Sequence, residues 1–106
     1  MIAMNTELFN HHMTESSKPV LVEFWAPWCV YCRRIAPALD KIAAQFADTL
    51  VIGQVNIDEE SQLADGERIE VVPTLILYQN GQALGSIVAP ESIAGIKNFI
   101  QETLNP

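Results

Sequence analysis

The amino-acid sequence predicts an α/β protein in which a central mixed β-sheet of four to five strands has helices on both faces. Residues 20–57 contain a β-rich run, a long amphipathic helix and a second β-rich run, the pattern of a right-handed βαβ unit with parallel strands. Asn80–Gly81 separates two further β-rich runs and favours a tight hairpin of antiparallel strands. A length of 106 residues is typical of one compact unit, so residues 1–106 are expected to form a single domain.

Two elements are predicted ahead of the βαβ unit. Residues 1–4 are expected to form a short edge strand. A helix follows, because apolar side chains recur at helical spacing and Asn5 or Thr6 can cap its first turn. The segment Ser16–Pro19 should end this helix, since serines and proline favour a turn there.

The βαβ unit itself begins with Val20–Trp25, which is apolar on both alternating faces except at Glu23. Such a run suits a central strand that is covered on both sides. After Trp28 a helix is expected to extend to about Ala47, with one buried stripe. That stripe consists of Ile35, Leu39, Ile42 and Phe46. Residues Leu50–Ile57 form the second strand of the unit.

The last third of the chain is predicted to hold a short helix, a hairpin and a final helix. Asp58–Glu70 is rich in acidic residues and is expected to form a short solvated helix. Thr74–Tyr78 and Ala83–Val88 are the strands of the hairpin around Asn80–Gly81. The final helix is expected to open at Pro90–Glu91, because proline suits a first helical position. Its buried stripe is Ile93, Ile96, Ile100 and Leu104.

Composition and charge narrow the classes of function. With 49% apolar residues the chain has enough apolar surface to build a core. Thirteen acidic against six basic residues give a formal net charge of −7, the wrong sign for binding nucleic acid or an anionic membrane surface. Residues 1–7 lack a signal-peptide pattern and no apolar stretch has the length of a membrane span, so a cytoplasmic location is expected.

The two cysteines carry the chemistry that the sequence predicts. Cys29 lies where the buried strand leads into the long helix, and the free N–H groups and positive dipole end of a helix N-terminus favour thiolate over thiol. Cys29 is therefore the expected nucleophile. Cys32 lies three residues on, on the same helix face and one turn deeper, and is expected to resolve the mixed disulfide that Cys29 forms with a partner. This cycle needs two sulfur atoms and no cofactor.

The spacing of possible ligands also bears on a metal or haem role for the cysteine pair. A zinc site needs about four ligands, and His11 and His12 are the only further candidates of the usual kind, so no metal is expected. Covalent haem attachment requires histidine directly after the second cysteine, where this chain has Arg33. A purely structural or incidental cysteine pair stays open at this point.

The residues around the cysteines make the prediction more specific. The run Phe24-Trp25-Ala26-Pro27-Trp28-Cys29-x-x-Cys32 resembles the active-site signature of thioredoxins, here with an atypical Cys-Val-Tyr-Cys motif. The resemblance covers nearly the whole chain and implies the thioredoxin fold. Its further pieces are Ala36–Pro37, Asn56-Ile57-Asp58, Val72-Pro73-Thr74 and Asn80–Gly81.

The resemblance also implies a substrate-binding groove. Pro73 would follow a cis peptide bond beside the dithiol and hold the backbone of Val72 open to an extended substrate segment next to Cys29. Trp28 would form one wall of this groove. Ala89 takes the place of a groove glycine, and its methyl group is expected to narrow the surface on which a partner's backbone lies.

Glu23 matches the position at which thioredoxins usually carry a buried aspartate that exchanges a proton with the resolving cysteine. A carboxylate in an apolar strand is costly unless it is protonated or hydrogen-bonded, so burial should raise its affinity for protons. The alternative is that this strand face is wet and Glu23 is merely solvated. Gln54 stands where the family usually has a lysine, so Glu23 is expected to be protonated more often than its counterpart in common thioredoxins.

The sequence therefore predicts a protein-disulfide reductase that acts through Cys29 and Cys32. By family resemblance, an NADPH-dependent thioredoxin reductase would return it to the dithiol form. Tyr31 brings no positive charge, unlike the histidine of strongly oxidising relatives, and its neutral side chain favours a reductant. The Tyr31 side chain is expected to be either an exposed contact residue or a packing residue. Three alternatives stay open: a thiol oxidant or isomerase, a thioredoxin-fold binding module with idle thiols, and an iron–sulfur cluster shared between two chains.

Overall fold

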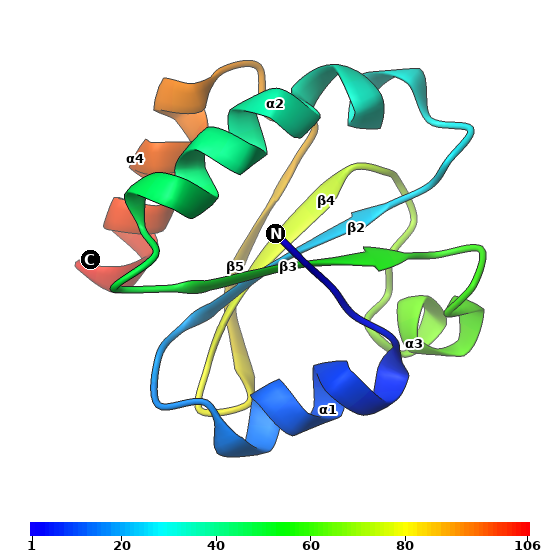
Figure 1. Cartoon of the computed structure of the whole chain (residues 1–106), viewed down its shortest axis with the longest axis horizontal. Coiled ribbons are helices and arrows are strands. Elements are labelled where there is room, and N and C mark those ends of the chain that lie inside the picture. Colours follow the sequence, from blue (N-terminus) through cyan, green and yellow to red (C-terminus); the bar gives the residue numbers. More distant parts are fainter.

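The computed structural model describes residues 1–106 as a five-stranded mixed sheet covered by four helices (Figure 1). The strands are β1 (Ile2–Ala3), β2 (Val20–Trp25), β3 (Val51–Asn56), β4 (Thr74–Gln79) and β5 (Gln82–Val88). The helices are α1 (Thr6–Glu15), α2 (Val30–Gln45), α3 (Ser61–Gly66) and α4 (Ile93–Leu104). The predicted fold class is therefore confirmed.

The sheet has the strand order β1-β3-β2-β4-β5. Strands β1, β3 and β2 are parallel, whereas β4 is antiparallel to β2 and β5 is antiparallel to β4. The βαβ unit and the hairpin are thus confirmed. Asn80 and Gly81 both have positive φ, 55° and 78°, as a two-residue hairpin turn of this kind requires. Between Leu77 and Tyr78 the pairing of β4 with the edge strand β5 shifts register, which marks a β-bulge.

Two apolar layers hold the helices against the sheet. In Figure 1, α2 and α4 lie on one side of the sheet and α1 and α3 on the other. Leu21 of β2 belongs to the core under α2 and α4, while its neighbours Val20 and Val22 belong to the core under α1. This alternation confirms that β2 is a central strand covered on both faces. Glu23 has the same parity as Leu21, so its side chain is directed into the layer of α2.

Several element ends differ from the prediction. Helix α4 begins at Ile93 rather than at Pro90–Glu91, because the hydroxyl of Ser92 accepts the Gly95 N–H at 3.0 Å and caps the first turn. Helix α2 ends at Gln45, two residues before the expected end. In the acidic segment 58–70, only Ser61–Gly66 is helical.

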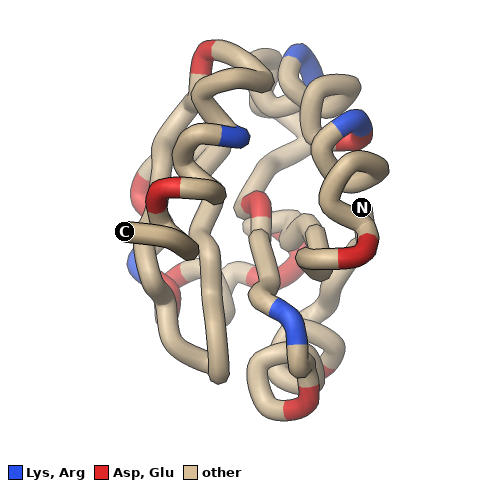
Figure 2. The backbone as a smooth tube through the Cα atoms, turned by 90° about the vertical axis from the view of Figure 1, so that its left-hand side faces the viewer, with Lys and Arg blue, Asp and Glu red and all other residues tan.

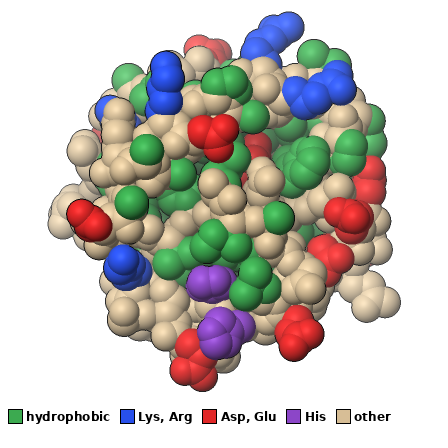
Figure 3. Space-filling view, in the orientation of Figure 1, with side chains coloured by type: hydrophobic (Ala, Val, Ile, Leu, Met, Phe, Trp, Pro, Cys, Tyr) green, Lys and Arg blue, Asp and Glu red, His purple; other side chains and the backbone are tan.

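Acidic residues outnumber basic residues along the chain. Acidic positions occur along much of the trace in Figure 2, whereas basic positions are few. On the face seen in Figure 3 the basic side chains stand apart from one another and form no continuous basic surface. No helix has the length and apolar character needed to cross a membrane.

The connection from β5 to α4 contains a strained residue that a substitution can test. Ala89 has φ 45°, in the left-handed region where an L-residue with a Cβ is disfavoured. We predict that Ala89→Gly raises the free energy of unfolding by about 0.5–1 kcal/mol, because glycine adopts this φ without a steric cost. Urea unfolding followed by fluorescence measures the change.

The matched control is Ala83→Gly, which lies on exposed β5 and is not among the positive-φ residues. There glycine should lower stability, because it only adds freedom to the unfolded chain. Equal destabilisation by both substitutions would contradict strain at Ala89.

Candidate active site

The two cysteines lie at the start of α2 and are joined by a disulfide bond, with their Cα atoms 5.3 Å apart. Cys29 is the N-cap residue of α2, and its Sγ accepts a hydrogen bond from the backbone N–H of Cys32 at 3.1 Å. Only 7% of Cys29 and 3% of Cys32 are exposed, so Cys32 is the deeper of the two. This hydrogen bond forms because the N–H groups in the first turn of a helix have no partner within the helix, and the Cys29 sulfur accepts one of them.

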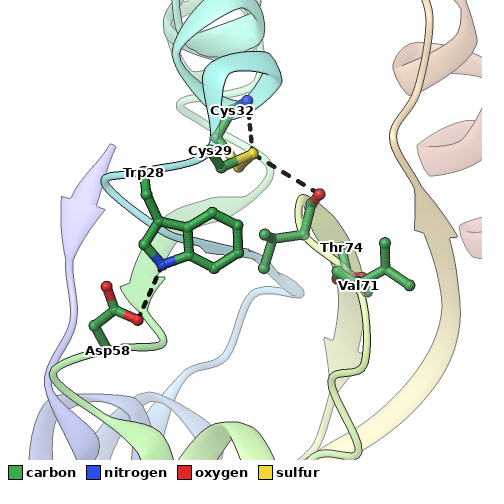
Figure 4. The surroundings of a disulfide bond; sticks show 7 residues. Trp28, Cys29, Cys32, Asp58, Val71 and Thr74 are labelled. Atoms are coloured by element: carbon green, nitrogen blue, oxygen red, sulfur yellow. Dashed lines mark hydrogen bonds between the residues drawn. A yellow bond between two sulfur atoms is a disulfide. The ribbon is translucent and has the colours of Figure 1, made fainter.

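Three of the predicted groove residues lie together beside the dithiol. Sγ of Cys29 is 3.8 Å from the carbonyl oxygen of Val72 (Figure 4). The peptide bond between Val72 and Pro73 is cis, as the family resemblance implied. The N–H of Ala89 donates to the carbonyl oxygen of Pro73 at 2.9 Å, which brings the end of β5 to the same place. The segment 71–74 is braced from within, because Oγ1 of Thr74 donates to the carbonyl of Val71 at 2.6 Å.

Trp28 lies next to the cysteines and is the most exposed large apolar side chain, with 64% of its surface accessible. Its indole Nε1–H donates to Oδ1 of Asp58 at 3.3 Å, and Figure 4 shows the ring nitrogen turned toward that carboxylate. The sequence placed Asp58 in the run Asn56-Ile57-Asp58 and at the start of an acidic solvated segment, and gave it no role in the site. Its place two residues after the end of the strand that pairs with β2 was the available signal, because the carboxyl ends of parallel strands meet at one edge of a sheet.

Glu23 is buried, with 3% of its surface exposed, so the alternative of a solvated side chain is wrong. Its Oε2 atom has no hydrogen-bond partner. Burial, and after it the negative charge of Asp40, raises the pKa of Glu23 from 4.5 to about 7. Gln54 pairs with Glu23 across the β2–β3 ladder and contributes no positive charge that would counter this shift.

Asp40 was not identified from the sequence as a member of this site. It lies on the exposed side of α2, one residue after the buried Leu39. Charged residues are common at the border of a buried helix stripe. The Asp40 charge acts on Glu23 because α2 packs on the face of the sheet into which the Glu23 side chain is directed. The site thus combines an outer dithiol with an inner carboxyl group that can hold or release a proton near neutral pH.

The arrangement of the two cysteines suits thiol–disulfide chemistry. No group of three or more His, Cys, Asp or Glu side chains lies close enough together to hold a metal ion. A pair of cysteines three residues apart at a helix N-terminus can pass two electrons by opening and closing one disulfide.

Comparison with known proteins agrees with this chemistry. Residues 1–102 match the family model described as Thioredoxin. The chain is 37% identical over 102 residues to "Thioredoxin 1" of Synechococcus elongatus, a match that covers 96% of this chain and 95% of the relative. It is 34% identical over 105 residues to "Thioredoxin" of Mycolicibacterium smegmatis, covering 97% and 94%. It is 38% identical over 103 residues to "Thioredoxin M-type, chloroplastic" of Chlamydomonas reinhardtii, covering 97% and 74%.

The same conclusion follows from the family model, the relatives, the fold and the geometry of the two cysteines. The chain belongs to the thioredoxin family of oxidoreductases, and its Cys29–Cys32 pair serves dithiol–disulfide exchange.

Proposed function

We propose that this protein reduces disulfide bonds in other proteins, with Cys29 as the attacking and Cys32 as the resolving thiol. The observation that carries the proposal is the bond from the Cys32 N–H to Sγ of Cys29. A thiolate accepts such a bond more strongly than a thiol does, so the helix start favours the reactive form of Cys29. Cys32 lacks this position and is more deeply buried, which suits a thiol that acts only on the neighbouring sulfur.

The proposed cycle balances as two exchanges. The Cys29 thiolate attacks one sulfur of the substrate disulfide, a mixed disulfide forms, and the other substrate sulfur leaves as a thiolate. Cys32 then loses its proton and attacks Sγ of Cys29, and the second substrate sulfur leaves. The substrate gains two electrons from the dithiol and two protons, one released by Cys32 and one taken from solvent, and the protein reaches the Cys29–Cys32 disulfide, the state in the structure.

We assign the proton of the second exchange to Glu23. Its side chain is directed into the layer of α2, the helix that carries Cys32, and its pKa of about 7 lets it accept or return a proton near neutral pH. The carboxyl oxygen without a hydrogen-bond partner is free for this purpose.

The proposed substrate is an extended segment that lies along Val72 and next to Cys29. The Val72 carbonyl oxygen already lies beside the sulfur, and backbone groups bind an extended chain through its own backbone. Trp28 would form one wall, and Ala89 would border the far side through its bond to Pro73.

An NADPH-dependent thioredoxin reductase is the electron donor that we propose, on the basis of family membership. The cytoplasm is the proposed location, because a reducing compartment keeps such a dithiol charged with electrons.

The first test is the reduction potential of the Cys29–Cys32 pair. Titration in defined thiol buffers, read by alkylation of free thiols, should give a value near about −270 mV, the thioredoxin range, since Tyr31 adds no positive charge beside the thiolate. A value of about −120 to −180 mV would instead identify an oxidant or isomerase.

The second test separates the roles of the two thiols. Cys32→Ser should accumulate a mixed disulfide through Cys29 with a reducible protein disulfide, because the resolving thiol is missing. Non-reducing gel electrophoresis measures the adduct. Cys29→Ser is the matched control and should give at least about tenfold less adduct, since the serine hydroxyl is a poor nucleophile. Unchanged function in cells that carry Cys29→Ser would indicate a binding module with idle thiols.

The third test uses the raised pKa of Glu23. Between pH 4.5 and about 7 the folded protein binds a proton at Glu23 that the unfolded chain releases, so stability falls as pH rises through this window. The loss amounts to about 3 kcal/mol at most. Glu23→Gln should remove this dependence, make the protein more stable than the parent above pH 7, and abolish the pH dependence of the resolving step in that window.

The exposed Glu102→Gln on α4 is the control for a lost carboxylate and should keep the parent's pH profile. Urea unfolding and stopped-flow oxidation across the pH range provide the two readouts. A Glu23→Gln protein with the parent's pH profile of resolution would remove Glu23 from the mechanism.

A further inference from the structure

Three chain segments meet around the dithiol, and one contact joins each pair. The cysteine motif contacts the loop before β4 through Cys29 Sγ and the Val72 carbonyl oxygen, at 3.8 Å. That loop contacts the end of β5 through Pro73 and Ala89, at 2.9 Å. The connection from β5 to α4 returns to the motif through Tyr31, whose hydroxyl donates to the Pro90 carbonyl oxygen at 2.7 Å. The contacts form a closed ring.

Tyr31 makes the only contact in this ring that depends on a side-chain hydroxyl. The bond spans 59 residues of sequence and is partly buried, and Pro90 is itself buried. Tyr31 also packs against the core under α2 and α4 and against the small cluster of the two cysteines. Phenylalanine would keep this packing, but it would leave the Pro90 carbonyl oxygen without its donor.

The segment that Tyr31 holds is one that needs a tether. Residues 89–92 lie between β5 and α4, because the helix begins only at Ile93 (Figure 1). Ala89 is held in the left-handed region, which costs free energy, and Pro90 has no N–H to donate. On the side of the dithiol, the segment is fixed by the Ala89 N–H and by the Pro90 carbonyl oxygen.

We propose that Tyr31 is a positioning residue for protein substrates: its hydroxyl holds the Ala89–Pro90 segment against the active-site helix, so that the groove is formed before the substrate arrives. The inference rests on the proposed function and concerns its substrate class. A disulfide within an extended protein segment must lie along this border, whereas a small disulfide reaches Cys29 without touching it. Tyr31 therefore acts on recognition rather than on the reactivity of the dithiol.

The test compares two substrates in Tyr31→Phe and in the parent. Pre-reduced protein is mixed with rising concentrations of insulin, and the limiting rate and the half-saturating concentration are measured separately. Tyr31→Phe should raise the half-saturating insulin concentration about fivefold, the effect of one lost hydrogen bond, with the limiting rate nearly unchanged. The rate constant with a small aromatic disulfide and the reduction potential should equal those of the parent.

Tyr78→Phe is the matched control, since Tyr78 is the other of the two tyrosines. It loses a hydroxyl bond to Glu67, between β4 and the segment after α3, and should change neither substrate's kinetics. Amide hydrogen exchange over residues 89–96 should become faster in Tyr31→Phe and stay at the parent's rate in Tyr78→Phe. This second readout does not depend on turnover.

The remaining outcomes each overturn a definite claim. Equal losses with insulin and the small disulfide, or a shifted potential with unchanged half-saturation, would mean that Tyr31 acts through the dithiol. Unchanged kinetics with both substrates would leave Tyr31 a packing residue. Failure of the parent to reduce insulin would instead overturn the proposed function, and the inference with it.

Discussion

The start of helix α2 is the constraint on which the rest of the site depends. A helix N-terminus needs an acceptor for its free N–H groups, and here one acceptor is a sulfur atom, Sγ of Cys29. A thiolate accepts this bond more strongly than a disulfide sulfur does, because its charge is attracted by the N–H group and the helix dipole. The cap therefore strengthens on reduction. The cap also requires that β2 and the loop after it place Cys29 at the first turn of the helix.

Two local costs lie close to this cap, and both belong to the proposed mechanism. Glu23 occupies a position of β2 where an apolar side chain would complete the core. Its pKa is raised mainly because burial destabilises the charged form of the carboxyl group. Ala89 occupies a backbone conformation that glycine would adopt more readily. Two well-packed layers on either side of the sheet supply the stability that tolerates these positions.

Local patterns predicted the fold because most elements have a clear period or turn signal. The apolar stripe of α2, the apolar run of β2 and the positive-φ pair Asn80–Gly81 are each contained in one short stretch of sequence. The predicted start of α4 was wrong because Pro90 and Ser92 are both helix-start signals and lie two residues apart, and Ser92 is the residue that caps the helix. The hydrogen bonds Trp28–Asp58 and Tyr31–Pro90 and the effect of the Asp40 charge on Glu23 had no local signature, since only the tertiary fold brings these pairs together.

Strand β5 lies at the edge of the sheet and has exposed apolar residues, among them Leu84 and Val88. An edge strand offers unpaired N–H and C=O groups to a second chain, and a long regular edge is a template for aggregation. The bulge between β4 and β5 interrupts that template, because it breaks the even spacing that strand addition needs. This irregularity and the net charge of −7, which makes copies repel one another, both disfavour edge-to-edge association.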